Sequence, residues 1–219
     1  MIIYNPQDAP LRKERISAAT ALLEQIPSKH CFITGSFLYR AKYRDIDIFV
    51  VSRTKKRLAV KEQRANITMI DFNALHSLFY HSIAKSCIAK GILPSRPLKV
   101  TLADYWEVIA AAVPMLLNQK NAYRKEVRFL ILYTEYFRTG KVLDSFQLDQ
   151  KIRSFGNYRD ILSYIGENTP KIMLRNGTRS YLKRFFYTQA GTYRDLRGYA
   201  AQDFLYNLAH QVTRVLAHG

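Results

Sequence analysis

The sequence predicts an α+β fold, in which a β-sheet core with flanking helices over residues 1–95 is followed by a helical domain over residues 98–219. Short runs of apolar and β-branched residues bounded by turn residues occur only in the first part. The second part shows almost only helical periodicity. Between them, Pro94 and Pro97 stand where a helix cannot continue, and we expect the domain boundary there.

The elements of the first domain follow in order along the chain. Residues 11–26 carry apolar side chains at helical spacing, which predicts an amphipathic helix. Two apolar runs, residues 31–34 and 46–51, predict strands, and a third strand is expected to end near Asp71. Residues 73–90 then predict a second helix, which ends before the prolines.

The second domain reads as a bundle of helices. Thr101 can cap a helix that reaches a kink or stop at Pro114. Residues 121–138 place apolar side chains on one face, and Gly140 follows just beyond the predicted end. Further helices are predicted over residues 146–155, 178–189 and 196–216.

Composition excludes several classes of protein. A hydrophobic content of 48% suits a packed core and no disordered class. The first residues lack the pattern of a secretory signal, and no run of about 18 apolar residues could span a bilayer. Cys31 and Cys87 are best read as reduced thiols. We therefore expect a cytoplasmic protein without a membrane partner.

One segment carries most of the chemical information. The first strand ends in Gly35-Ser36, and the next carries Asp45 at its edge and Asp47 two residues on. Side chains alternate along a strand, so both carboxylates project from one face and repel each other unless a cation lies between them. Mg²⁺ is held by one or two carboxylates together with substrate phosphates, and a glycine turn lets the backbone approach phosphate oxygens. The segment predicts metal-dependent phosphate chemistry.

Asp71 has two interpretations. If its strand lies beside the strand of Asp45 and Asp47, it completes a triad of carboxylates. Alternatively, Asp71 caps the helix that begins near Asn73, which is a common position for aspartate. The metal-dependent chemistry predicted from this sequence depends on the first arrangement, in which the three carboxylates converge on bound magnesium.

The pattern of Gly-Ser, eight residues, Asp-x-Asp and a later apolar-Asp-apolar strand resembles the DNA polymerase β-like nucleotidyltransferase superfamily. The resemblance implies a nucleotidyltransferase-type mixed β-sheet. It implies that Gly35 and Ser36 contact the nucleotide phosphates and that Asp45, Asp47 and Asp71 are the catalytic metal ligands. Two Mg²⁺ ions and a nucleoside triphosphate substrate follow from the same resemblance.

Charge suggests the partner. There are 34 Lys and Arg residues against 17 Asp and Glu, a net charge of +17, which is the usual footprint of a nucleic-acid partner. Arg124 and Arg128, near the start of the 121–138 helix, are candidates for nucleotide binding. Candidates for binding the RNA backbone directly follow the strand of the two aspartates: Arg53, Lys55, Lys56 and Arg57. For each group, a solvated charged surface is the alternative.

Together these features predict a nucleotidyltransferase that moves a nucleoside monophosphate to the 3′-hydroxyl of an RNA, with tRNA as the leading acceptor. A protein hydroxyl is an alternative acceptor, as in toxin–antitoxin pairs whose antitoxin nucleotidylates a partner toxin. A third alternative is a catalytically silent RNA-binding protein on the same scaffold.

Overall fold

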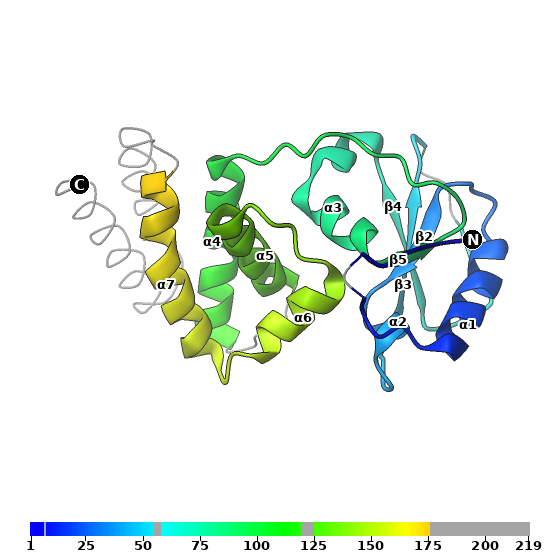
Figure 1. Cartoon of the computed structure of the whole chain (residues 1–219), viewed down its shortest axis with the longest axis horizontal. Coiled ribbons are helices and arrows are strands. Elements are labelled where there is room, and N and C mark those ends of the chain that lie inside the picture. The colour runs from blue at the N-terminus through cyan, green and yellow to red at the C-terminus, as the bar shows by residue number, and fades with distance from the viewer. Residues whose placement is uncertain (7, 55–57, 120–124, 176–219) are drawn as a thin grey trace. The chain divides into compact units, whose positions relative to one another are not determined.

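A computed structural model describes residues 1–6, 8–54, 58–119 and 125–175. The helices predicted over residues 178–189 and 196–216 lie outside the described residues, as do Lys55, Lys56, Arg57 and Arg124. The chain divides into two compact units (Figure 1). One unit comprises Met1–Val100 and Val142–Asp149, and the other comprises Thr101–Lys141 and Gln150–Gly219.

The first unit is an α+β structure built on one mixed sheet. Its strands are β1 (Ile2–Tyr4), β2 (Cys31–Thr34), β3 (Ile46–Val51), β4 (Ala65–Ile70) and β5 (Cys87–Ala89). They lie in the order β1-β5-β2-β3-β4. All neighbouring pairs are antiparallel except β3 and β4, which are parallel. The helices of this unit are α1 (Lys13–Glu24), α2 (Ser36–Tyr39), the 3₁₀-helix η1 (Phe72–His76) and α3 (Leu78–Lys85).

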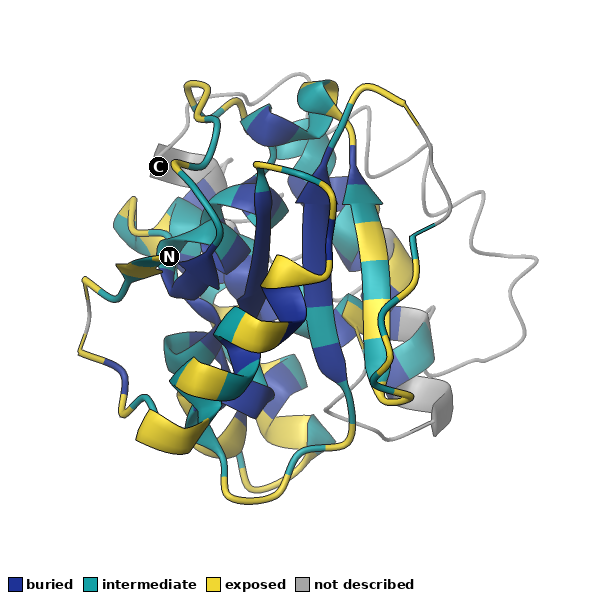
Figure 2. Ribbon diagram, turned by 90° about the vertical axis from the view of Figure 1, so that its right-hand side faces the viewer, coloured by how far each residue is buried: buried dark blue, intermediate teal, exposed yellow. Residues whose placement is uncertain are grey.

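Alternation along β3 divides the apolar core between the two faces of the sheet. Ile46, Ile48 and Val50 belong to a buried cluster with Leu23 of α1. On the opposite face, Phe49 and Val51 pack in a second cluster with residues of η1 and α3. In Figure 2 the central strands are buried, whereas the edge strand β4 alternates between exposed and partly buried positions. The sheet is thus a rigid frame for the residues at its ends.

The 73–90 helix predicted from sequence is wrong in two places. Ser77 interrupts it, because its hydroxyl accepts the Tyr80 N–H at 3.1 Å and begins α3 as a separate helix. The chain then leaves the helix at Ser86, and residues 87–89 form β5, a fully buried strand between β1 and β2. Pairing on both sides outweighs the helical pattern of three residues.

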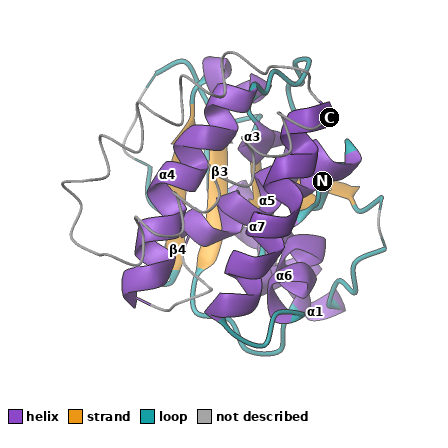
Figure 3. Ribbon diagram, turned by 90° about the vertical axis from the view of Figure 1, so that its left-hand side faces the viewer, coloured by secondary structure: helices purple, strands orange, loops and turns teal. Residues whose placement is uncertain are grey.

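The described part of the second unit contains helices and no strand (Figures 1 and 3). They are α4 (Leu102–Gln119), α5 (Lys125–Thr139), the end of α6 (Ser145–Arg153) and α7 (Tyr158–Arg175). Thr101 caps α4 as predicted, because its hydroxyl accepts the Asp104 N–H and the Asp104 carboxylate accepts the Thr101 N–H. The helix continues through Pro114, so of the predicted kink or stop the stop is wrong. Burial of Val113 and Leu116 offsets the hydrogen bond lost at proline.

The first unit also differs from the predicted domain boundaries of 95 and 98. It extends to Val100 and takes in residues 142–149, which return to it after α5. Polar side chains of α3 hold this returning segment. The Ser82 hydroxyl donates to the Leu143 carbonyl and the Lys85 ammonium donates to the Val142 carbonyl, both at 2.7 Å.

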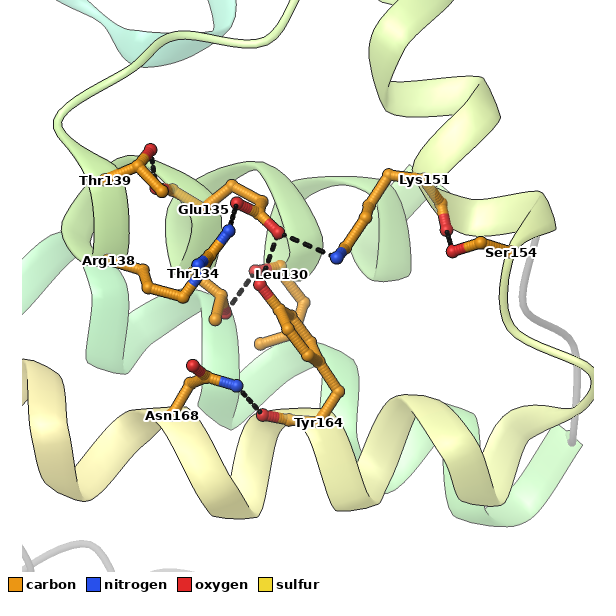
Figure 4. A network of polar contacts seen from close by, with 9 residues as sticks. All are labelled: Leu130, Thr134, Glu135, Arg138, Thr139, Lys151, Ser154, Tyr164 and Asn168. Carbon is orange, nitrogen blue, oxygen red and sulfur yellow. Dashed lines mark hydrogen bonds and ion pairs between the residues drawn. The ribbon is translucent and has the colours of Figure 1, made fainter.

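A network of charged groups joins three helices of the second unit (Figure 4). The buried Glu135 carboxylate accepts from Arg138 at 2.6 Å, from Lys151 at 3.1 Å and from the Tyr164 hydroxyl at 2.5 Å. Burial alone would raise the pKa of Glu135. Hydrogen bonds from Tyr164, Arg138 and Lys151 outweigh burial, and the net pKa lies below its usual value.

We expect Glu135→Gln to lower the free energy of unfolding by about 2 kcal/mol. This is less than for a fully buried ion pair, because Arg138 and Lys151 keep partial contact with water. A group whose folded pKa is lowered stabilises the protein above its unfolded pKa, and that stability is lost as the pH falls through the folded pKa.

Urea unfolding measured against pH checks this expectation. The difference in unfolding free energy between wild type and Glu135→Gln should be full at neutral pH and shrink as the pH falls below about 4.5, the ordinary carboxyl value. Glu107→Gln, an exposed glutamate on α4, is the control and should change little. A difference that stays constant across the acidic range would contradict the network's role.

Candidate functional site

The Gly35-Ser36 turn joins β2 to α2. Gly35 has φ +85° and ψ −166°, a backbone conformation that is essentially restricted to glycine. A Cβ at Gly35 would lie 3.5 Å from Asp47 Oδ2, an ordinary contact distance. Glycine is therefore required by the backbone angle and not by lack of space. The same distance shows that the Asp47 carboxylate lies directly against the turn.

Asp45 and Asp47 lie where β3 begins. Asp47 is opposite Thr34, the last residue of β2. Alternation puts both aspartates on the face of Phe49, which is the α3 side of the sheet. Both carboxylates are partly exposed. The structure thus brings the two predicted metal ligands together with Gly35.

Arg44 is the cation nearest to Asp45 among the described contacts. Its Nη2 and Nε donate to Asp45 Oδ2 at 2.9 and 3.2 Å. The hydrogen bond with Asp45, and the charges of Asp45 and Asp47, raise the pKa of Arg44 above its usual value. Both carboxylates therefore raise the pKa of this one guanidinium, as expected for two acids on one face of a strand.

Asp71 does not join these two acids, and the expected carboxylate triad is wrong. β3 and β4 are parallel, with Asp47 opposite Asn66 and Val51 opposite Ile70. Asp71 follows Ile70, five residues beyond the level of Asp47, or about 16 Å at about 3.3 Å per residue. Its Oδ1 instead accepts the Asn73 N–H at 2.7 Å and caps η1. The capping alternative is the one observed.

Asn66 occupies the position that sequence reasoning assigned to the third acid. It is exposed on β4, directly opposite Asp47, and it shares the face of Ile70. An asparagine carbonyl is an oxygen ligand for hard cations. The pattern of Ile67 and Met69 toward the α1-side core marks Asn66 as pointing the other way. The sequence pattern does not show how β4 pairs with β3, and this pairing is what places Asn66 opposite Asp47.

The returning segment 142–149 contacts residues on either side of Gly35 and Ser36. Thr34 Oγ1 donates to the Ser86 carbonyl at 2.7 Å and lies 3.3 Å from Ser145 Oγ. The Tyr39 hydroxyl donates to the buried Asp149 carboxylate at 2.7 Å, and Arg40 pairs with the same carboxylate. Both ends of the Gly35 turn are thereby fixed to α6.

Two of the predicted cationic residues, Arg53 and Arg128, belong to the described part of the chain. Arg53 follows the far end of β3, on the level of Asp71, with its guanidinium 5.3 Å from the centre of the Phe72 ring. It therefore does not lie beside Asp45 and Asp47. Arg128 belongs to α5 in the second unit.

The donor set fits a magnesium ion that also binds a substrate. No group of three or more His, Cys, Asp or Glu side chains in the described ranges could hold a metal. Two carboxylates, with the Asn66 carbonyl opposite, form a set of hard oxygen ligands. Such a set suits Mg²⁺ when phosphate oxygens and water complete the coordination.

Comparison with family models, with curated protein sequences and with solved structures found no match. Within the described residues, no helix combines the length and the apolar character needed to cross a bilayer.

Asp71→Ala should separate the two interpretations of that residue. We expect the variant to lose about 1 kcal/mol of stability, because the cap of η1 is removed. Binding of Mg²⁺ and nucleoside triphosphate should be unchanged, because Asp71 is remote from Asp45 and Asp47. Isothermal titration calorimetry and thermal unfolding measure these effects, and Asp71→Ser, which keeps a capping oxygen, should restore the stability. Loss of Mg²⁺-dependent triphosphate binding in both variants would show that Asp71 belongs to the site.

Proposed function

We propose that this protein is a magnesium-dependent nucleotidyltransferase of the DNA polymerase β-like type, acting on an RNA 3′-hydroxyl, with tRNA as the leading acceptor. The observation that supports this proposal best is the contact of the Asp47 carboxylate with the Gly35 turn. A site for metal and a site for phosphates are thereby adjacent on one sheet. The net charge of +17 supports a polyanionic acceptor.

In this proposal each residue has a defined task. Asp45 and Asp47 hold Mg²⁺, and Asn66 supplies a neutral oxygen beside them. Gly35 and Ser36 present backbone N–H groups and a hydroxyl to the triphosphate. The acceptor hydroxyl gives its proton to water and its oxygen attacks the α-phosphorus to form a phosphodiester bond, while the bond to the β-phosphate oxygen breaks and pyrophosphate leaves. When bound, Mg²⁺ would neutralise the charge that develops on the phosphates. Asp71 has no part in the reaction.

Labelling tests the proposal directly. The purified protein is incubated with Mg²⁺, total RNA and each of the four α-labelled triphosphates in turn, and the labelled 3′ ends are sequenced. We expect one triphosphate at least to label RNA, with tRNA ends enriched. Label found only in protein would move the acceptor to a protein hydroxyl of a partner.

A silent RNA-binding protein is the second candidate, and one observation favours it. The third position beside Asp47 carries a neutral asparagine, so the described site has two acids and not three. A silent protein would bind Mg²⁺ and triphosphate without labelling any acceptor. The Asn66→Asp variant would then be the appropriate test, since restoring a third carboxylate should produce labelling in a scaffold that lost it.

A further inference from the structure

Cations gather at the end of the sheet where β3 and β4 begin. We define the cation–aromatic cluster as Arg15, Lys42, Tyr43, Arg44 and Arg64. These residues come from α1, from the loop between α2 and β3, and from the position directly before β4. The Arg64 carbonyl accepts the Ile46 N–H at 2.9 Å, and Arg44 contacts Asp45. The cluster therefore adjoins the proposed metal site.

Tyr43 orders the arginines of this cluster. The guanidinium of Arg15 lies 4.4 Å from the centre of the Tyr43 ring, and that of Arg64 lies 5.1 Å from it. Arg15 also lies 5.2 Å from the Phe37 ring, and its buried Nε has no hydrogen-bond partner in the structure as described. A guanidinium held over a ring loses less freedom when its N–H groups bind a phosphate.

Three cations of the cluster, Lys42, Arg44 and Arg64, face water. The Arg44 side chain is 92% exposed, and Lys42 is also exposed. Arg64 is 58% exposed and lies 3.8 Å from Glu62, a distance at which a solvated ion pair contributes little. A magnesium ion on Asp45 would compete for the oxygen that Arg44 now contacts. Arg44 would then be available for another anion.

We propose that the cation–aromatic cluster binds the phosphate backbone of a single-stranded acceptor RNA. This inference rests on the proposed function for the identity of the acceptor. Exposed cations from two chain segments, the loop before β3 and the residue before β4, can contact more than one phosphate. Arginine side chains can also stack with unpaired bases. Of the residues predicted from sequence to bind RNA, Arg53 follows the opposite end of β3 and does not lie beside Asp45.

The test is a salt titration of RNA binding without Mg²⁺ or triphosphate. A fluorescein-labelled single-stranded RNA 12-mer is bound to the full chain and followed by fluorescence anisotropy. The variant Lys42→Gln/Arg44→Gln/Arg64→Gln removes three exposed cations. Each phosphate contact contributes about 0.7 to the slope of log affinity against log salt. Because Arg44 stays paired with Asp45 when Mg²⁺ is absent, we expect this variant to change the slope by about 1.4, the value for the two contacts of Lys42 and Arg64.

The matched control is Arg53→Gln/Lys99→Gln/Lys141→Gln. It removes the same charge from three exposed positions, including one arginine stacked on an aromatic ring. We expect the slope to fall by less than about 0.7, one contact. Thermal unfolding should show that both variants remain folded.

Three outcomes would overturn the inference: no RNA binding by the wild type, equal losses in both variants, or equal competition by polyglutamate. Because neither metal nor triphosphate is present, this result is independent of the transferase reaction. If the protein binds RNA through the cluster but labels no acceptor, the proposed transferase function is wrong and the inference about the RNA-binding cluster stands.

Discussion

Replacing Asp47 with asparagine is expected to lower RNA labelling by about 10³-fold or more. Loss of a group that merely orients a metal ligand costs about 10–100-fold, and Asp47 is proposed as a ligand itself. Asparagine keeps nearly the same shape but removes the charge that holds the cation. Mg²⁺-dependent triphosphate binding, measured by calorimetry, should weaken in parallel.

The matched control for this experiment is Asp71→Asn, an aspartate on the same sheet and outside the site. It should label RNA at the wild-type rate, and circular dichroism should show that both variants keep their helices and strands. Labelling by Asp47→Asn at the wild-type rate would exclude the proposed mechanism. Loss of labelling in both variants with unchanged circular dichroism would show that Asp71 belongs to the site, whereas a changed spectrum would point to a general effect on the fold.

Gly35→Ala is expected to have the second largest effect. At φ +85° an alanine is strained by about 1–3 kcal/mol, and the chain can relieve that strain only by moving the turn. Since Asp47 lies against the turn, its carboxylate should shift as well. A displacement of about 1 Å in a reacting site can lower the rate about 10²-fold. Labelling rates and urea unfolding measure the two effects together.

Gly140→Ala separates strain from function. Gly140 also has a positive φ, +74°, and nothing lies within 4 Å of a Cβ at that position. The variant should therefore lose stability by a similar mechanism while labelling is unchanged. If Gly35→Ala loses stability but labels normally, the turn does not hold the nucleotide.

The two aspartates could be predicted from sequence because their spacing is local. Alternation fixes the common face of Asp45 and Asp47 whatever surrounds the strand. The third position depends on how β4 pairs with β3, which is a long-range property. A parallel pairing puts Asn66 beside Asp47 and moves Asp71 to the other end of the strand. A strand that ends in aspartate has the same sequence pattern whether it pairs with its neighbour in parallel or antiparallel orientation.

The helices and strands follow the same rule. β3 and α5 were predicted because their apolar patterns are long and regular. β1 was not predicted, since a strand of three residues at the sheet edge carries almost no pattern. The helix α7 was not predicted, because it contains Gly166 and Pro170, which have low helix propensity. Complete burial of Ile161 and Ile165 outweighs that propensity in the folded chain.

Asp149, which Tyr39 and Arg40 contact from α2, has a consequence for how this protein can be dissected. A fragment that stops at Val100 would lack Asp149 and the carbonyl groups that Ser82 and Lys85 contact. Those side chains would lose their partners, and the short helix after the glycine would have little to hold it in place. Inactivity of such an isolated fragment would reveal nothing about its chemistry, so assays on this protein call for the uncut polypeptide.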